Sequence, residues 1–189
     1  MIKFYYGTMG AGKTTELIKT YDIYKRKHLS PVVIKPIIDT REGNFDGWGT
    51  TQSRITKESV PAFYYKDIQN ITKFSKQNTA LLIDEAQFCS KKDVEFICNY
   101  ADDNNITVLA YGLKTDVNGN LFEGAEKWLA LSDINVELEN LCQVKDCTNK
   151  AILHKRYING KPDKSKQSVV IDGVDKVTYL SVCRKHWRD

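Results

Sequence analysis

The sequence contains no apolar run approaching the roughly 20 residues that a bilayer-spanning helix needs. It also shows no internal repeat and no low-complexity tract, and Met1 leads directly into a short apolar segment rather than a secretion signal. The formal net charge is only +4, which suits anionic substrates without requiring a nucleic-acid partner. We therefore expect a cytoplasmic protein that works without a membrane or nucleic acid.

The composition is that of an ordinary globular protein. Its 189 residues are 41% hydrophobic and 28% charged, enough for one sizeable core and a small appended module. In a reducing compartment the five cysteines favour metal ligands or buried thiols over disulfides. Cys89 and Cys98 lie within predicted core segments, so we expect them to be buried thiols.

The segment from Gly7 to Thr14 fits the phosphate-loop pattern G-x-x-x-x-G-K-[ST]. An apolar run at 2–6 predicts a strand before it, and a periodic pattern from Leu17 to Tyr24 predicts a helix after it. Such a loop points backbone N–H groups at phosphate oxygens beside a helix N-terminus. Lys13 should reach the β- and γ-phosphates, and the Thr14 hydroxyl should complete a Mg²⁺ shell. The predicted nucleotide-binding residues of this segment are Gly7, Thr8, Met9, Gly10, Ala11, Gly12, Lys13, Thr14 and Thr15.

Strand and helix patterns alternate through the first three quarters of the chain, which predicts an α/β fold with a parallel sheet flanked by helices. Strands are expected at 31–38, 80–83 and 106–111, and helices at 64–74, from 90 onward and at 122–131. Residues 40–51 are rich in Gly, Asp and Thr and predict a loop. The pattern weakens after residue 141, so we place a boundary between residues 1–141 and 142–189.

Asp84 and Glu85 follow the apolar run at 80–83 directly. A carboxylate at the end of such a strand holds Mg²⁺ in phosphate-loop enzymes, usually through water. Asp84 fits that role, and Glu85 would then lie beside the γ-phosphate, where an acceptor hydroxyl or water must lose its proton. The alternative is a solvated carboxylate pair at a strand end.

Four soft ligands are spread over the last fifty residues: Cys142, Cys147, Cys183 and His186. Thiolate and imidazole ligands in a closed tetrahedral set indicate structural zinc, with no position left for a catalytic water. The spacing leaves open that His154 replaces Cys147 as a ligand.

Four motifs together resemble those of the type II thymidine kinases, which are compact cytosolic enzymes: residues 7–14, 83–88, 111–116 and 181–186. The resemblance implies a phosphate-loop, RecA-like domain with a small zinc-binding lasso domain. It implies transfer of the γ-phosphate of ATP to the 5′-hydroxyl of thymidine or deoxyuridine, with Mg²⁺ and structural zinc as cofactors. It also implies a homotetramer that is inhibited by thymidine triphosphate.

The same resemblance implies roles for individual residues. Glu85 is the base for the 5′-hydroxyl, Arg41 and Lys13 act on the transferred phosphoryl group, and Asp39 and Asp84 serve the metal-nucleotide centre. The residues implied to contact the nucleoside are Met9, Phe88, Leu113, Phe122, Arg156 and Tyr179. The chain departs from the family pattern in a longer segment at 173–179, which bears on nucleoside choice rather than on phosphate chemistry.

A second interpretation is a nucleic-acid-stimulated ATPase with a zinc ribbon, because residues 84–87 superficially resemble a helicase box and the tail is basic. Such enzymes normally need two nucleotide-binding lobes, and this chain has length for one. If the segment from Arg156 to Tyr179 closes over a nucleoside, loss of zinc should affect nucleoside binding or folding before it affects ATP contacts.

Overall fold

A seven-stranded sheet forms the centre of the N-terminal part of the chain. The computed structural model describes residues 1–37, 47–74, 79–163, 165, 167 and 176–188. The strands of this sheet are β1 (Ile2–Tyr6), β2 (Ser30–Pro36), β3 (Gly47–Gln52), β4 (Ser59–Tyr65), β5 (Thr79–Ile83), β6 (Thr107–Gly112) and β7 (Ile134–Glu137). Their spatial order is β3-β4-β2-β5-β6-β1-β7. All neighbours are parallel except β3 and β4, so the predicted α/β fold is confirmed with one antiparallel edge.

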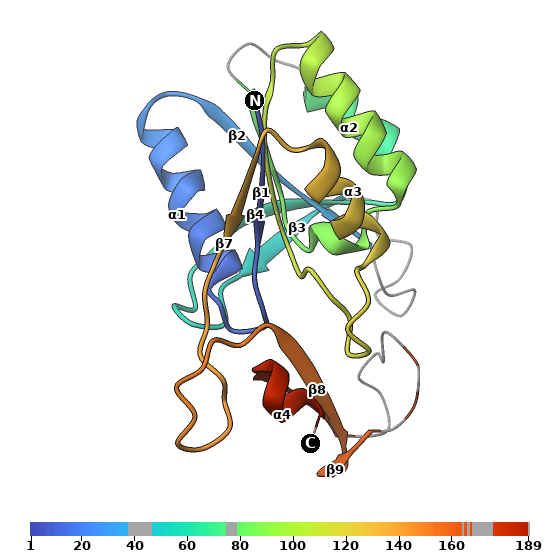
Figure 1. The fold of residues 1–189 in the computed structure, drawn as a ribbon. Coiled ribbons are helices and arrows are strands. Elements are labelled where there is room, and N and C mark those ends of the chain that lie inside the picture. The colour runs from blue at the N-terminus through green and yellow to red at the C-terminus, as the bar shows by residue number, and fades with distance from the viewer. Residues whose placement is uncertain (38–46, 75–78, 164, 166, 168–175, 189) are drawn as a thin grey trace.

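Helices cover both faces of this sheet (Figure 1). Helix α1 (Lys13–Arg26) lies on one face and buries Leu17 and Ile18 against it. Helices α2 (Lys91–Asp103) and α3 (Glu123–Leu131) cover the other face, together with the 3₁₀ helices η2 (Ile68–Phe74) and η3 (Ala86–Phe88). The helix expected from residue 90 onward is confirmed as α2, which buries Val94, Ile97, Cys98 and Ala101 and begins with a capping box formed by Ser90 and Asp93.

Two predictions about local structure were wrong. The expected loop at 40–51 becomes strand β3 from Gly47 onward, and Tyr64, assigned to a helix, lies in strand β4. Pro61 obscures β4 in the sequence, yet its missing N–H does not interrupt the ladder to β2. That pairing begins only at Ala62, opposite Val33.

The C-terminal residues build a second, smaller sheet below the first one in Figure 1. Its strands are β8 (Leu153–Ile158), β9 (Lys161–Pro162) and β10 (Val177–Val182), all antiparallel in the order β10-β8-β9, followed by helix α4 (Arg184–Arg188). A small cluster of Cys142, Val182 and Cys183, with Leu153 and Trp187 against it, forms its core. Within the described ranges, no helix has the length and apolar character that crossing a membrane requires.

Candidate active site

The phosphate-loop segment leaves β1 at Gly7 and enters α1 at Lys13, at the carboxyl edge of the large sheet. Gly10 and Gly12 adopt φ of +78° and +81°, a left-handed conformation that favours glycine. Gly7 must also lack a side chain, because a Cβ there would lie 2.5 Å from the carbonyl oxygen of Leu138. The backbone therefore curls as a phosphate-binding loop requires.

Lys13 folds back over this loop. Its Nζ donates to the carbonyl oxygens of Gly7 at 3.1 Å and Thr8 at 2.8 Å. Burial lowers the pKa of Lys13 to about 8, while the nearby carboxylates of Glu85 and Asp84 oppose the shift. A bound polyphosphate would place negative charge beside Lys13 and so favour its charged ammonium form.

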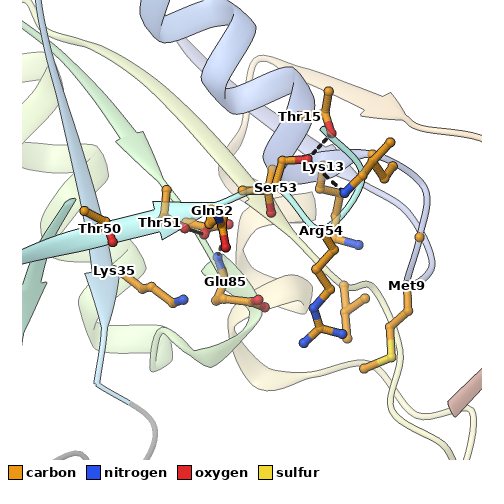
Figure 2. Close-up of a pocket in the computed structure, with 16 residues that line it drawn as sticks. Met9, Lys13, Thr15, Lys35, Thr50, Thr51, Gln52, Ser53, Arg54 and Glu85 are labelled. Atoms are coloured by element: carbon orange, nitrogen blue, oxygen red, sulfur yellow. Dashed lines mark hydrogen bonds between the residues drawn. The ribbon is translucent and has the colours of Figure 1, made fainter. Parts of the chain in front are cut away.

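A cavity of about 220 Å³ opens beside the loop (Figure 2). Its wall is made from the phosphate loop and the start of α1, the carboxyl ends of β2, β5 and β6, and the end of β3 with the β3–β4 connection. The residues that line it are Met9, Gly10, Gly12, Lys13, Thr14, Thr15, Lys35, Thr50, Thr51, Gln52, Ser53, Arg54, Ile55, Asp84, Glu85 and Leu113. Ligands bind at this edge of open parallel sheets.

Asp84 lies at the end of β5 and is 3% exposed. Its carboxylate accepts hydrogen bonds from the Thr51 hydroxyl and, at 3.1 Å, from the backbone N–H of Glu85. Burial raises the pKa of Asp84 and the charge of Glu85 raises it further, while Lys35 and the Thr51 hydrogen bond lower it. A divalent cation would relieve the repulsion between these two carboxylates.

Glu85 adopts a left-handed conformation with φ of +53°, which is uncommon for a residue with a side chain. Gln87 holds the carboxylate in place: its Nε2 donates to Glu85 Oε2 at 2.7 Å, and its Oε1 accepts from the Leu113 N–H at 2.9 Å. Gly112 makes room for this contact, because a Cβ there would lie 2.8 Å from Gln87 Oε1. The strained backbone and the buried amide together aim Glu85 into the cavity.

The cavity is also reached by two cationic side chains, Lys35 and Arg54, to which no role was assigned from the sequence. Figure 2 shows Lys35, from β2, and Arg54, from the β3–β4 connection, extending into the same space as Glu85. The connection is tied to α1 by a 2.8 Å hydrogen bond between the hydroxyls of Ser53 and Thr15. Residues 53–55 also resemble a segment of the type II thymidine kinases, and this was the signal that could have pointed to Arg54. The predicted residues Asp39 and Arg41 lie outside the described residues, as do residues 173–175 of the longer segment.

The residues predicted to contact the nucleoside fall into separate places. Met9 and Leu113 line the main cavity. Phe88 and Phe122 face each other edge to face, with ring centroids 5.6 Å apart, and line a second cavity that Gln87 and Asp116 also border. The two aromatic rings offer an apolar wall to this second cavity.

Arg156 and Tyr179 lie opposite each other on β8 and β10 and are not among the residues that line either of these two cavities. Arg156 is 3% exposed and its Nε donates to Asp163 Oδ2 at 2.6 Å. Its Nη2 donates to the hydroxyl of Ser165 and the carbonyl of Gln167. Arg156 therefore organises the described part of the segment after β9.

The four predicted metal ligands converge. The ligand atoms of Cys142, Cys147, Cys183 and His186 all lie within 4.8 Å of one another, and His186 Nδ1 is 3.4 Å from both Cys142 Sγ and Cys183 Sγ. Three sulfurs and one imidazole nitrogen form a common donor set for tetrahedral zinc. His154, the alternative ligand, instead accepts a hydrogen bond from Met9.

Comparison with known proteins gives one consistent result. The family model described as thymidine kinase matches residues 1–187. Proteins named thymidine kinase from Streptococcus pyogenes serotype M3 and Streptococcus agalactiae serotype Ia are each 38% identical over 185 residues. Each alignment covers 96% of this chain and 94% of the relative, so the similarity includes both the phosphate loop and the cysteine cluster.

Proposed function

The chain belongs to the thymidine kinase family and is an enzyme of that class, and on this premise we propose how its residues carry out the reaction. The reaction is transfer of the γ-phosphate of ATP to the 5′-hydroxyl of thymidine or deoxyuridine, which yields the nucleoside monophosphate for salvage into DNA synthesis. One observation supports this most directly: Lys13, Asp84 and Glu85 line one cavity beside a phosphate loop.

The phosphate loop would bind ATP through residues 7–15. Lys13 would exchange its hydrogen bonds to the loop carbonyls for contacts with the β- and γ-phosphates. The negative charge of these phosphates would favour the ammonium form of Lys13, which burial disfavours. Mg²⁺, which neutralises charge on the phosphates when bound, would be held by Thr14 and, through water, by Asp84. Asp39 is proposed for the same centre on the resemblance alone.

Glu85 would accept the proton of the 5′-hydroxyl. Phosphoryl transfer passes through a loose transition state, so positioning and charge neutralisation contribute more than a strong base. Arg54 and Lys35 extend into the cavity and suit the neutralising role, to which the resemblance also assigns Arg41. Gln87 fixes the direction of the Glu85 carboxylate.

The thymine base would be bound by Met9 and Leu113, which line the main cavity with Glu85, and by the rings of Phe88 and Phe122, which line the second cavity with Gln87. An apolar wall accommodates a 5-methyl group. Arg156 and Tyr179 would act from the C-terminal sheet, Arg156 by shaping the segment after β9 rather than by direct contact.

We further propose that residues 142–189 form a zinc-binding lasso domain beside a kinase domain of residues 1–141. Zinc held by Cys142, Cys147, Cys183 and His186 would have a structural role, because four protein ligands leave no position for water. A cytoplasmic location agrees with five cysteines that are all free thiols. A homotetramer and inhibition by thymidine triphosphate are proposed from the family resemblance.

The test is transfer of label from γ-labelled ATP to a panel of nucleosides, with zinc content measured on the same sample. We expect label in thymidine monophosphate, and a loss of turnover of about 10²–10⁴-fold in Glu85→Gln with ATP binding retained. Glu95→Gln, an exposed glutamate on α2 paired with Lys127, is the matched control and should leave turnover unchanged. Stimulation of ATP hydrolysis by single-stranded nucleic acid, without transfer to thymidine, would instead support the ATPase interpretation, which the family match does not favour.

A further inference from the structure

The peptide of Met9, within the phosphate loop, is held by side chains from segments far along the chain. Its N–H donates to His154 Nε2 at 2.9 Å, and its carbonyl accepts from Ser181 Oγ at 2.7 Å. The same carbonyl accepts from Asn140 Nδ2 at 2.9 Å. Because both polar groups of Met9 are bonded in this way, the shape of the loop at this residue depends on the position of the C-terminal sheet.

His154 and Ser181 act as one unit. They lie directly opposite each other in the antiparallel pair of β8 and β10, so their side chains project from the same face. Both are buried, with exposures of 3% and 0%. Two buried side chains on adjacent strands have little conformational freedom. Together they hydrogen-bond the Met9 peptide at its N–H and at its carbonyl. We call His154 and Ser181 the Met9 clasp.

The hydrogen bond from Met9 requires that His154 Nε2 carry no proton. Burial and the charge of Lys13 lower the pKa of His154 to about 4, against a hydrogen bond to the Thr115 backbone that raises it. The ring is therefore neutral near pH 7, with Nε2 free to accept from Met9. The bond to Thr115 also connects the clasp to the loop that follows β6, next to Leu113 of the cavity.

The clasp is joined to the cysteine cluster by short connections. The Ser181 N–H donates to Gln143 Oε1 at 2.7 Å, and the Gln143 N–H donates to the Ser181 carbonyl at 2.9 Å. Gln143 follows Cys142 directly, and Ser181 stands two residues before Cys183. A shift of these two cysteines must therefore move Ser181, and with it the carbonyl of Met9.

We propose that His154 and Ser181 are positioning residues that couple the Cys142–Cys147–Cys183–His186 cluster to ATP binding at the phosphate loop. This inference rests on the proposed ATP-binding function and extends it. Because the phosphate loop is bonded to the segment that carries the cysteine cluster, we expect zinc loss to weaken ATP binding directly, contrary to the expectation that it affects nucleoside binding or folding before ATP contacts. Coupling is reciprocal, so bound ATP must also strengthen metal retention by the same factor.

The first test compares two variants, Ser181→Ala and His154→Phe, with the control Ser132→Ala. The control makes the same serine-to-alanine change at the residue that follows α3. The zinc-loaded proteins are titrated with a non-hydrolysable ATP analogue and Mg²⁺. Each clasp variant should raise the Kd about five- to tenfold. His154→Phe leaves the partly buried Met9 N–H without its acceptor, and Ser181→Ala removes one of the two side-chain donors to the Met9 carbonyl, leaving only Asn140. Ser132→Ala should bind as the unmodified protein does. A change of less than about twofold in the folded Ser181→Ala protein would overturn the proposal, whether or not His154→Phe folds.

The second test measures the equilibrium affinity for zinc in competition with a chelator, with and without the ATP analogue. The analogue should raise the zinc affinity of the unmodified protein and of Ser132→Ala, and this gain should be lost in Ser181→Ala. Equal zinc affinities with and without saturating analogue in the unmodified protein would overturn the coupling while leaving the proposed function intact. An unmodified protein that fails to bind the analogue would instead contradict both.

Discussion

Lys13 should make ATP binding depend on pH in a window where few other groups titrate. Burial lowers the pKa of Lys13 to about 8 in the nucleotide-free protein. A triphosphate placed against its ammonium group favours the charged form, so the pKa of Lys13 must rise when ATP binds. Binding above pH 8 therefore requires uptake of a proton, and affinity should fall as the pH rises.

The size of the effect follows from that pKa. The ammonium form makes up about three-quarters of the free protein at pH 7.5 and about one-tenth at pH 9. If only the charged form binds well, the Kd for ATP rises about eightfold between these two pH values. Near pH 9, binding should take up close to one proton for each ATP bound.

Isothermal titration calorimetry with a non-hydrolysable ATP analogue and excess Mg²⁺ measures both quantities, because proton uptake appears as a dependence of the heat on the buffer. Zinc-loaded protein keeps the cluster thiolates from titrating in the same window. Lys13→Met should bind more weakly and lose the pH dependence. A Kd that is constant from pH 7.5 to 9, or a dependence that persists in Lys13→Met, would refute this account of Lys13.

Three further predictions concern the supports of the site. Gln87→Ala should lower kcat about 10–100-fold with little change in KM for ATP, because Glu85 loses the donor that orients it; a rise in KM alone would contradict this role. Thr51→Val removes a hydrogen bond that lowers the pKa of Asp84, so the acid limb of the kcat/KM profile should move to higher pH; an unmoved profile would exclude an ionised Asp84 from the reaction. Trp128→Ala should reduce the free energy of unfolding in urea by about 3–5 kcal/mol, since the ring is fully buried and its Nε1 donates to the Ala86 carbonyl; a loss under about 1 kcal/mol would mean that the core repacks.

The phosphate loop and the pair at residues 84–85 were predictable because their chemistry depends on backbone shape and position along the chain. Glycines at residues 7, 10 and 12 specify a curled loop between a strand and a helix. A continuous apolar run at 80–83 specifies a buried parallel strand whose end carries the carboxylates. The structure confirms the strands, the loop and the helix as predicted.

The contributions of Lys35, Arg54 and Gln87 could not be read from local pattern. Each reaches the cavity or Glu85 only because of the order of strands in the sheet, which brings β2 beside β5 and places Gln87 against the end of β6. The β3–β4 hairpin was missed because glycine and threonine in β3 resemble loop composition and because a proline such as Pro61 argues against a strand in the sequence.

Spacing along the chain alone also could not decide whether Cys147 or His154 is the fourth soft ligand. Both residues follow Cys142 at plausible distances along the chain. The fold separates them: Cys147 Sγ lies 4.0 Å from Cys183 Sγ, whereas His154 Nε2 is already occupied by the N–H of Met9. The same contact that removes His154 from the metal set makes it part of the Met9 clasp.

The most direct measurement of the central claim is a crystal structure with thymidine and a non-hydrolysable ATP analogue bound together. We expect the 5′-oxygen within about 2.6–3.2 Å of a Glu85 carboxylate oxygen, in line with a γ-phosphate held by the phosphate loop. A thymidine bound with its 5′-oxygen far from Glu85, or a triphosphate away from Lys13, would contradict it.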